Sequence, residues 1–299
     1  MSAGPKVDPA LRAQEGYVEE LATLDARQFA IAIRKLADSL SYGIDKSPYL
    51  GSGTEYVQSR PYQWGDPIRS IDWRVTARTR RPYVKEYEAP KSTPCYLFLD
   101  TSASMTIASG RASKYELALY IAGGLALACL DRVSPVGVIG AGERSMRVEP
   151  SLSRARVMQW LLQLRTHRFD ERTTLAQRLR EVLPTLGQRS LLIVLSDLHD
   201  EGALKALQHA GHAHDCVALQ LVDPAEAGLR GAGFLRAREA ETGREFVTSG
   251  LAAWSDPREL ASALVRSGVD CLTLRAGEPC ASKLREMFKN RGGAARGTR

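Results

Sequence analysis

Residues 97–105 read Leu97-Phe98-Leu99-Asp100-Thr101-Ser102-Ala103-Ser104-Met105, an apolar run that ends in a cluster of side-chain oxygens. A short apolar run bounded by small polar residues is typical of a central strand in a parallel sheet, which is buried on both faces. Asp100 then stands at the carboxyl end of this strand, the edge of an open α/β sheet where ligands bind. Asp100, Ser102 and Ser104 can turn three oxygens toward one point, and an all-oxygen set suits a hard cation such as Mg²⁺.

Apolar strands and amphipathic helices alternate along the chain from Cys95 onward. The pattern predicts strands at 95–100, 136–141, 191–197, 216–222 and 271–274, separated by helices at 113–130 and 153–165, from 174 and from 202, with a closing helix. Such alternation indicates a doubly wound, mainly parallel α/β sheet. Residues 234–248, centred on Glu241-Thr242-Gly243, interrupt it and predict an inserted β-hairpin.

Two further segments precede the sheet. Apolar residues recur every three to five positions between about Glu19 and Leu40, which predicts an amphipathic helix that ends before Gly43. The next residues are rich in Gly, Pro, Arg, Asp and aromatics and predict an irregular segment with short strands. We therefore expect four parts: a helical segment at 1–43, an irregular/β segment at 44–93 packed on the main domain, the α/β domain at 94–290 with its hairpin at about 231–250, and a disordered tail at 291–299.

Composition limits the class of protein. The 299 residues, 44% of them hydrophobic, are enough for a sizeable core. The five cysteines are scattered and never form a C-x-x-C pair, which argues against a disulfide framework and a zinc site. The net charge of +7 arises from 41 bases interspersed with 34 acids and without a nucleic-acid-binding module, so we expect no nucleic-acid partner. Without an apolar run of about 18 residues or a signal peptide, we predict a cytoplasmic protein without a membrane span.

The N-terminal helix has two interpretations. It packs on the sheet domain, or it docks on a partner or a membrane surface. Its polar face lacks the Lys/Arg enrichment of membrane-surface helices, which favours packing.

Two later segments supply more oxygens. The run 191–197 is a second buried strand ending on an acid, Asp197, and the segment 170–175 places Thr173 and Thr174 at a helix start. In these residues the chain resembles the von Willebrand factor A domain and its metal-ion-dependent adhesion site, whose pattern is Asp-x-Ser-x-Ser, a later Thr and a strand-end Asp. The matching residues are Asp100, Ser102, Ser104, Thr173 and Asp197.

This resemblance implies that the Ser and Thr hydroxyls contact Mg²⁺ or Mn²⁺, while the two aspartates hold the ion largely through water. One position is left for a partner's carboxylate. Glu171-Arg172 stands where the family has glycines, and Thr174 is the alternative to Thr173. The competing interpretation has no metal: Ser102 or Ser104 caps a helix, and Asp197 caps the next helix or pairs with an arginine.

A second resemblance lies ahead of the sheet, in Arg60-Pro61-Tyr62-Gln63-Trp64-Gly65-Asp66-Pro67-Ile68-Arg69-Ser70-Ile71-Asp72-Trp73, followed by Ala77-Arg78 and residues 84–88. With the Glu241-Thr242-Gly243 hairpin, it resembles the family called domain of unknown function 58 over roughly residues 45–275. Physically, the segment alternates arginines and acids around aromatic rings. We favour a structural clamp with Arg–carboxylate pairs and buried rings over a partner surface.

Members of that family are commonly encoded beside MoxR-type AAA+ ATPases. The resemblance therefore implies a metal-dependent protein-interaction module, an adaptor or chaperone-like partner of such an ATPase. The chain has no Gly-x-x-x-x-Gly-Lys-Ser/Thr loop, so nucleotide hydrolysis would come from the partner.

The alternative function is enzymatic, a metal-assisted phosphatase or hydrolase that uses Asp100. Such chemistry usually needs a second carboxylate beside the nucleophile, but serines occupy positions 102 and 104, and the chain lacks a Gly-x-Ser-x-Gly elbow. We therefore favour a protein that is not an enzyme. The clustered histidines, His199, His209, His212 and His214, are expected to be solvated rather than ligands.

Overall fold

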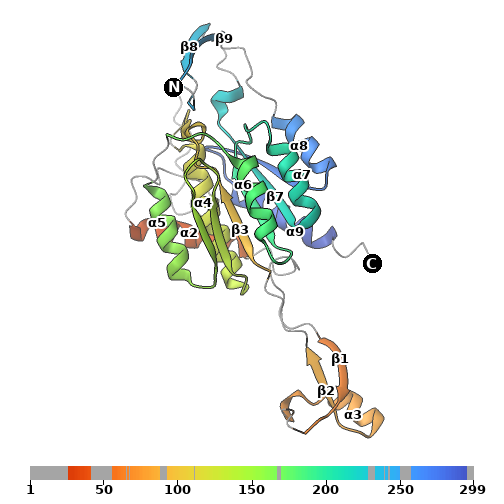
Figure 1. Ribbon diagram of the computed structural model, residues 1–299. Coiled ribbons are helices and arrows are strands. Elements are labelled where there is room, and N and C mark those ends of the chain that lie inside the picture. The colour runs from red at the N-terminus through yellow and green to blue at the C-terminus, as the bar shows by residue number, and fades with distance from the viewer. Residues whose placement is uncertain are drawn as a thin grey trace.

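The computed structural model describes residues 26–41, 56–64, 66, 68–87, 93–110, 112–166, 170–227, 233–238, 240–241, 243–249 and 257–294. Its centre is a six-stranded sheet with the order β10-β7-β6-β3-β4-β5 (Figure 1). The strands are β3 (Cys95–Leu99), β4 (Val136–Gly140), β5 (Arg147–Ser151), β6 (Leu191–Ser196), β7 (Asp215–Val222) and β10 (Asp270–Arg275). All neighbours pair in parallel except β4 and β5.

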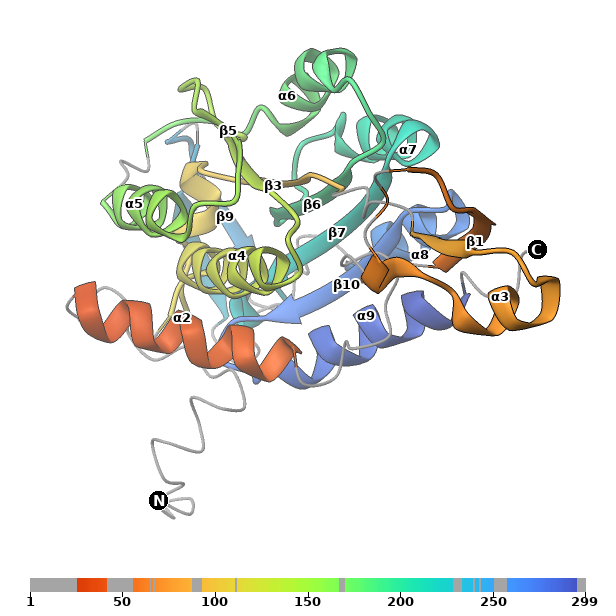
Figure 2. The same ribbon diagram turned by 90° about the horizontal axis from the view of Figure 1, so that it is seen from below.

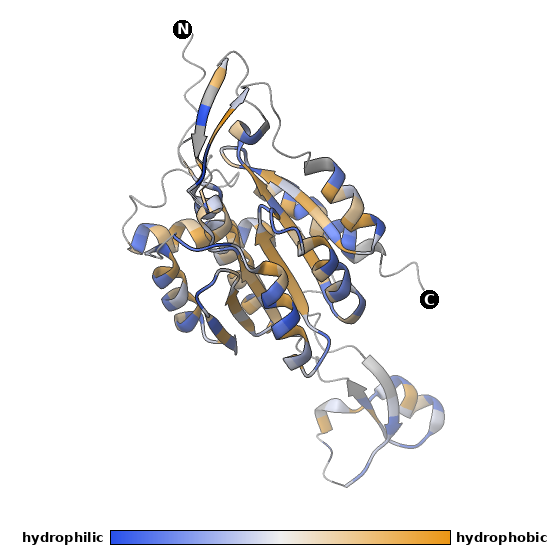
Figure 3. Ribbon diagram, turned by 45° about the horizontal axis from the view of Figure 1, so that its top comes forward, coloured by the Kyte–Doolittle hydropathy of each residue, from blue (hydrophilic) through white to orange (hydrophobic). Residues whose placement is uncertain are grey.

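Helices cover both faces of this sheet (Figure 2). One face carries α4 (Lys114–Asp131), α5 (Arg154–Arg165) and α9 (Ala281–Ala294), and the other carries α6 (Leu175–Val182), α7 (Ala203–Ala213) and α8 (Pro257–Arg266). Because side chains alternate along a strand, Leu97 and Leu99 join the first core while Tyr96 and Phe98 join the second. Figure 3 shows the resulting hydrophobic strands between helices with hydrophilic outer surfaces. The predicted doubly wound, mainly parallel α/β fold is confirmed.

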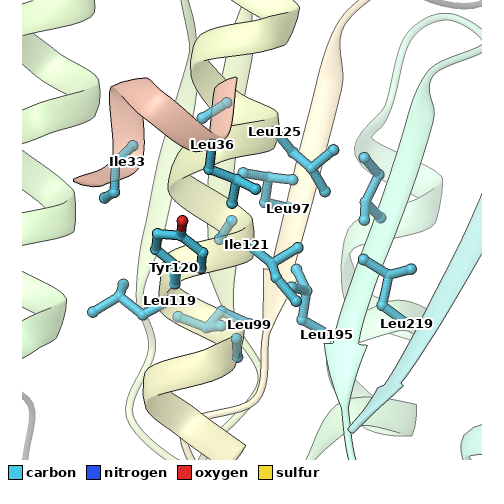
Figure 4. Packing of buried hydrophobic residues seen from close by; sticks show 14 of the residues in the cluster. Ile33, Leu36, Leu97, Leu99, Leu119, Tyr120, Ile121, Leu125, Leu195 and Leu219 are labelled. Carbon is cyan, nitrogen blue, oxygen red and sulfur yellow. The ribbon is translucent and has the colours of Figure 1, made fainter. Parts of the chain in front are cut away.

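The helix α2 (Ala26–Ser41) packs on α4 at close range. It buries Ile33 and Leu36 against α4 (Figure 4). There the two side chains lie against consecutive glycines, Gly123 and Gly124. A Cβ atom at Gly123 would lie 2.5 Å from Ile33 Cδ1, and one at Gly124 would lie 2.5 Å from Leu36 Cδ2. In the described residues, packing on the sheet domain is therefore the correct interpretation of this helix. The predicted start near residue 19 lies outside the described residues.

Residues 56–87 form a small unit of their own. The strands β1 (Tyr56–Pro61) and β2 (Tyr83–Tyr87) pair antiparallel, and the 3₁₀ turn η2 (Ile68–Ser70) and the helix α3 (Trp73–Thr79) lie between them. Figure 1 draws this unit apart from the six-stranded sheet, so the described residues give no support to packing of 44–93 on the main domain.

The predicted Arg–carboxylate pair is present in this unit, but the predicted burial of the rings is wrong. The Arg60 guanidinium donates two 2.8 Å hydrogen bonds to Asp66, while Trp64 is fully exposed and Trp73 is 67% exposed. Asp72 caps α3 by accepting hydrogen bonds from the amides of Arg74 and Val75. A two-stranded unit with one short helix has too little interior to enclose two indole rings.

The inserted hairpin is present as β8 (Phe234–Arg238) and β9 (Glu245–Ser249). The described part of the main domain also contains the 3₁₀ turns η3 (Ala103–Thr106), η4 (Leu183–Thr185) and η5 (Pro224–Ala227). The predicted tail at 291–299 begins too early, because α9 continues to Ala294. In the described part of the chain, no helix combines the length and the apolar character needed to cross a bilayer.

Candidate functional site

The five predicted site residues meet at the carboxyl ends of β3 and β6. These strands are parallel neighbours, with Leu99 opposite Leu195, so Asp100 and Asp197 leave the sheet side by side. Ser104 Oγ donates to Asp197 Oδ2 at 2.8 Å and lies 3.0 Å from Ser102 Oγ. Thr173 Oγ1 donates to Asp100 Oδ2 at 3.2 Å. Three separate segments thus supply one hydrogen-bonded cluster of oxygens, whose metal-binding role stays a prediction.

The structure distinguishes the two threonines. Thr174 directs its hydroxyl to the backbone carbonyls of Gly142, at 2.7 Å, and Ala141, at 3.3 Å. Thr173 alone of the two contacts an aspartate of the cluster. Thr173 is therefore the threonine that belongs to the site.

Glu171 stands where the von Willebrand factor A pattern has a glycine, and its side chain fixes the position of the loop that carries Thr173. Its buried carboxylate accepts hydrogen bonds from Thr101 Oγ1, at 2.7 Å, and from the Arg144 amide, at 2.6 Å. A Cβ atom at Gly142 would lie 2.4 Å from this carboxylate, so the glycine allows the close approach. The Glu171 carbonyl also accepts from the amide of Ala103 at 2.9 Å, which ties this loop to the one that carries Ser102 and Ser104.

Helix capping does not account for these residues. Ser102 occupies the N-cap of η3 but its side chain makes no capping hydrogen bond, and the Ser104 hydroxyl is directed to Asp197. The N-cap of α7 is Gly202 rather than Asp197, and Asp197 pairs with a lysine rather than with an arginine.

Asp100 is completely buried and strongly influenced by its surroundings. Burial, and then the nearby charge of Asp197, raise the pKa of Asp100 to about 7. Hydrogen bonds from Ser196 Oγ, at 2.5 Å, and from the Ser102 amide, at 3.0 Å, oppose that rise. Several hydrogen-bond donors thus fix the position of the Asp100 carboxyl group, while burial and the charge of Asp197 make its ionised form unfavourable.

Asp197 has a different balance. Burial acts to raise its pKa, but the charges of Lys114 and His199, with hydrogen bonds from Lys114 and Ser104, outweigh burial and lower it. Asp197 therefore carries the more stable negative charge of the two aspartates. Leu198, directly after it, has φ of 61°, a left-handed conformation that a branched side chain rarely adopts and that often accompanies functional sites.

Sequence reasoning missed two ionic groups at the site, Lys114 and Glu226. Lys114 Nζ is fully buried, lies 2.7 Å from Asp197 Oδ2 and also contacts Glu226 in η5. Lys114 is the first residue of a largely apolar helix, and this position is the sequence signal that could have marked it.

His199 is exposed, as expected, and its Nδ1 lies 3.4 Å from Asp197 Oδ2. Asp197, His199 and Glu226 could together offer three ligand atoms within 4.8 Å of one another. The expectation of a solvated side chain is wrong for His214, which is buried and accepts a hydrogen bond from the Ser190 amide at 3.4 Å.

A third missed residue comes from the hairpin. Burial raises the pKa of Glu241, in the turn between β8 and β9, and the nearby Thr173 amide and Ser104 side chain act to lower it. The sequence identified this turn but gave no sign that it reaches the carboxyl edge of the sheet.

The donor set fits Mg²⁺ or Mn²⁺. The hydroxyls of Ser102, Ser104 and Thr173 and the carboxylates of Asp100 and Asp197 are hard oxygen donors, gathered where two buried carboxylates repel each other. A divalent cation would relieve this repulsion, which a single lysine ammonium offsets only in part. These five residues are the ones that would hold the ion.

Comparisons with known proteins place the chain among uncharacterized relatives. A family model described as "Protein of unknown function DUF58" matches residues 58–251. Uncharacterized proteins of Mycobacterium bovis and Mycobacterium tuberculosis are each 25% identical over 227 residues, which is 74% of this chain and 72% of theirs. The crystal structure of the Ro (Rsr) protein of Deinococcus radiodurans matches 97% of this chain at 15% identity and a TM-score of 0.36, and the match spans only 50% of that structure.

Proposed function

The chain belongs to the DUF58 family, and from that membership and the oxygen cluster we propose a metal-dependent protein–protein interaction module. In this proposal Mg²⁺ or Mn²⁺ binds at Asp100, Ser102, Ser104, Thr173 and Asp197. The ion then accepts a carboxylate from an Asp or Glu of a partner. The observation that carries the proposal is the hydrogen-bonded convergence of these five side chains at one edge of the sheet.

The chemistry of the donors supports binding rather than catalysis. Three of the five donors are neutral hydroxyls, so a divalent ion held there keeps much of its positive charge and attracts an incoming carboxylate. Asp100, the nucleophile that the enzymatic alternative requires, is fully buried, and its Oδ2 accepts hydrogen bonds from both Thr173 and Ser196. A carboxylate held in this way is poorly placed to attack a substrate.

For the partner, we propose a MoxR-type AAA+ ATPase or a client complex on which it acts. The support is the sequence resemblance, since DUF58 proteins are commonly encoded beside such ATPases. This partner also underlies the proposal that the protein works in the cytoplasm, as an adaptor or a chaperone-like factor.

Thermal unfolding with and without metal tests the site. We expect Mg²⁺ or Mn²⁺ to raise the melting temperature of the wild-type chain, with a stabilisation of about 2.7 kcal/mol at a concentration one hundred times Kd. Asp100→Ala and Ser104→Ala should lose the response. Ser134→Ala is the matched control, because Ser134 is equally buried and its hydroxyl has no hydrogen-bond partner in the described structure. A melting temperature that metal does not change would contradict the proposal.

A pull-down in Mg²⁺ and in chelator tests the partner. Recovery of an AAA+ ATPase in Mg²⁺ only, and its loss with Asp100→Ala, is the expected result. Turnover of a phosphoester by the purified wild-type protein, abolished by Asp100→Asn, would instead favour the metal-assisted phosphatase or hydrolase.

A further inference from the structure

A cavity of about 550 Å³ lies at the edge of the sheet opposite to the oxygen cluster. Asp215 and Asp270, the first residues of β7 and β10, line it. Because these strands run parallel to β3 and β6, their first residues lie at the amino edge of the sheet. The helix α9 contributes Met287 and Arg291 to the lining, and α8 contributes Val265. A volume of this size is typical of small-molecule sites.

A single arginine pairs with both carboxylates that line the cavity. Arg291 Nη2 contacts Asp215 Oδ1, and Arg291 Nε lies 3.0 Å from Asp270 Oδ2. The side chains of Arg291 and Asp215 are 9% and 14% exposed, whereas the side chain of Asp270 is 51% exposed. The two carboxylates therefore exceed by one charge the arginine that contacts them, and Asp270 is open to a further cation.

The Asp215 carboxylate also has one oxygen without a hydrogen-bond donor. Its Oδ2 atom is buried and has no hydrogen-bond partner in the described structure. Buried polar atoms in proteins nearly always have a partner, so an exception requires an explanation. Burial raises the pKa of Asp215, and the charge of Arg291 does not fully oppose that rise. A positively charged donor beside Oδ2 would satisfy the oxygen and stabilise its charge.

The remainder of the lining offers one further cation. Arg189 precedes β6, is exposed, and forms no ion pair or hydrogen bond in the part of the chain that the structure describes. Its guanidinium is available to an anionic group at the side of the cavity. An anion alone is a poor match for the cavity, because it would also approach the carboxylates of Asp215 and Asp270.

We propose that this cavity binds a small aliphatic amine, whose ammonium group donates to Asp215 Oδ2 and pairs with Asp270. An ammonium carries three N–H donors and one positive charge, which matches both the donor that Oδ2 lacks and the excess carboxylate. The aliphatic chain packs on Val265 and Met287. Two kinds of ligand share this chemistry: a free diamine or polyamine, and a basic amino acid whose carboxylate would pair with Arg189.

Calorimetric titration of the full chain tests this site. Putrescine and L-lysine are the amine probes, and 1,4-butanediol is the uncharged analogue of putrescine. The titrations contain chelator, so that no metal ion at the oxygen cluster takes up the carboxylate of lysine. We expect each amine to bind at one site per chain and butanediol not to bind, because only an ammonium supplies a charge-assisted hydrogen bond.

Substitution of the carboxylates locates the bound amine. Asp215→Asn should weaken putrescine binding about ten-fold or more, because a hydrogen bond between charged groups is lost. Asp270→Asn should also weaken it, and this variant at the more exposed carboxylate decides the test if Asp215→Asn does not fold. Asp131→Asn is the matched control and should bind like the wild type, because Asp131 also pairs with an arginine, Arg154, but does not line the cavity.

Comparison of the two probes identifies the kind of ligand. Tighter binding of L-lysine than of putrescine would identify an amino acid, and Arg189→Gln should then remove the difference. L-Lysine binding that is no tighter than putrescine binding would identify a free amine.

Hydrogen exchange gives a second measurement of binding at this place. Residues 265–271 and 287–291 should be more protected with putrescine than without it. The inference is overturned if neither amine binds the wild type by calorimetry or exchange, if butanediol binds as tightly as putrescine, or if both carboxylate variants keep the wild-type affinity. None of these results bears on the oxygen cluster, so the proposed function is tested separately.

Discussion

Lys114 places a positive charge inside the protein, directly against Asp197. Its ammonium is fully buried, and both of its described partners, Asp197 and Glu226, are acids. A buried charge of this kind is tolerated only with partners, and the loss of one partner leaves the others uncompensated. Lys114 thus supplies part of the positive charge that the acidic edge of the sheet requires, and a metal ion would supply the rest.

Replacement of this lysine should change both stability and metal response. Lys114→Met keeps the length of the side chain but leaves Asp197 and Glu226 without their cation, so we expect a loss of about 3–5 kcal/mol in the free energy of unfolding in chelator. Mg²⁺ should stabilise the variant more than it stabilises the wild type. Denaturant unfolding measures both effects, with Lys205→Met, on the exposed side of α7, as the control. A variant as stable as the wild type in chelator would show that the pair contributes little.

Asp100 should make the stability of the metal-free protein depend on pH. Its pKa is about 7 in the folded protein, against 3.8 in the unfolded chain. Between these values the folded state retains a proton that the unfolded state has released. The free energy of unfolding therefore falls as pH rises from about 4 to 7, and the contribution of Asp100 does not change further above pH 7. One such group contributes a slope of at most about 1.4 kcal/mol per pH unit.

Denaturant unfolding in chelator at pH 5, 6, 7 and 8 measures this slope. Asp100→Asn, which cannot titrate, should have a smaller slope than the wild type, and the difference between the two proteins isolates the contribution of Asp100. Parallel pH profiles for the two proteins would contradict the assignment.

At the scale of single elements, the sequence predicts the strands that have a clear hydrophobic pattern and misses an edge strand that has none. The central strands β3 and β6 are buried on both faces and read as continuous apolar runs. The strand β5 (Arg147–Ser151) was missed, because it lies at the edge of the sheet, pairs only with β4 and contains polar residues and Pro150. Proline is tolerated at such an edge, so neither periodicity nor composition marks the strand.

The contact between α2 and α4 depends on glycine at two positions. We expect Gly124→Val to destabilise the protein by about 1–3 kcal/mol, because the added methyl groups would overlap Leu36, which is already 2.5 Å from the position of a Cβ atom. In a Leu36→Ala background the same change should cost less, since the overlap is removed. Denaturant unfolding of the four proteins measures this coupling, and Gly187→Val, which meets no atom within 4 Å of its Cβ position, is the control. Additive effects of the two changes would contradict the close packing.

At the scale of the whole molecule, the fold was more predictable than the site. Alternating strands and helices are local patterns, and the five oxygen donors follow from strand ends whose meeting is dictated by a parallel sheet. Lys114 and Glu226 are 112 positions apart, and no local sequence pattern indicates that Lys114 pairs with both Glu226 and Asp197. The sequence predicts the inserted hairpin that carries Glu241, but no local pattern indicates that its turn lies close to Ser104 and Thr173.

The packing of α2 has a consequence for the order of events during synthesis. Ile33 emerges from the ribosome 90 residues before Gly123, the residue against which it packs. At translation rates of about 5–20 residues per second, the apolar face of α2 waits roughly 5 to 18 seconds for its partner helix. Through that interval the nascent chain exposes Phe29, Ile33, Leu36 and Leu40 together, a surface that ribosome-associated chaperones are suited to shield. The helix α9, which also contributes to the core on this face, begins 240 residues after α2 ends (281 − 41), so native burial of α2 is completed later still.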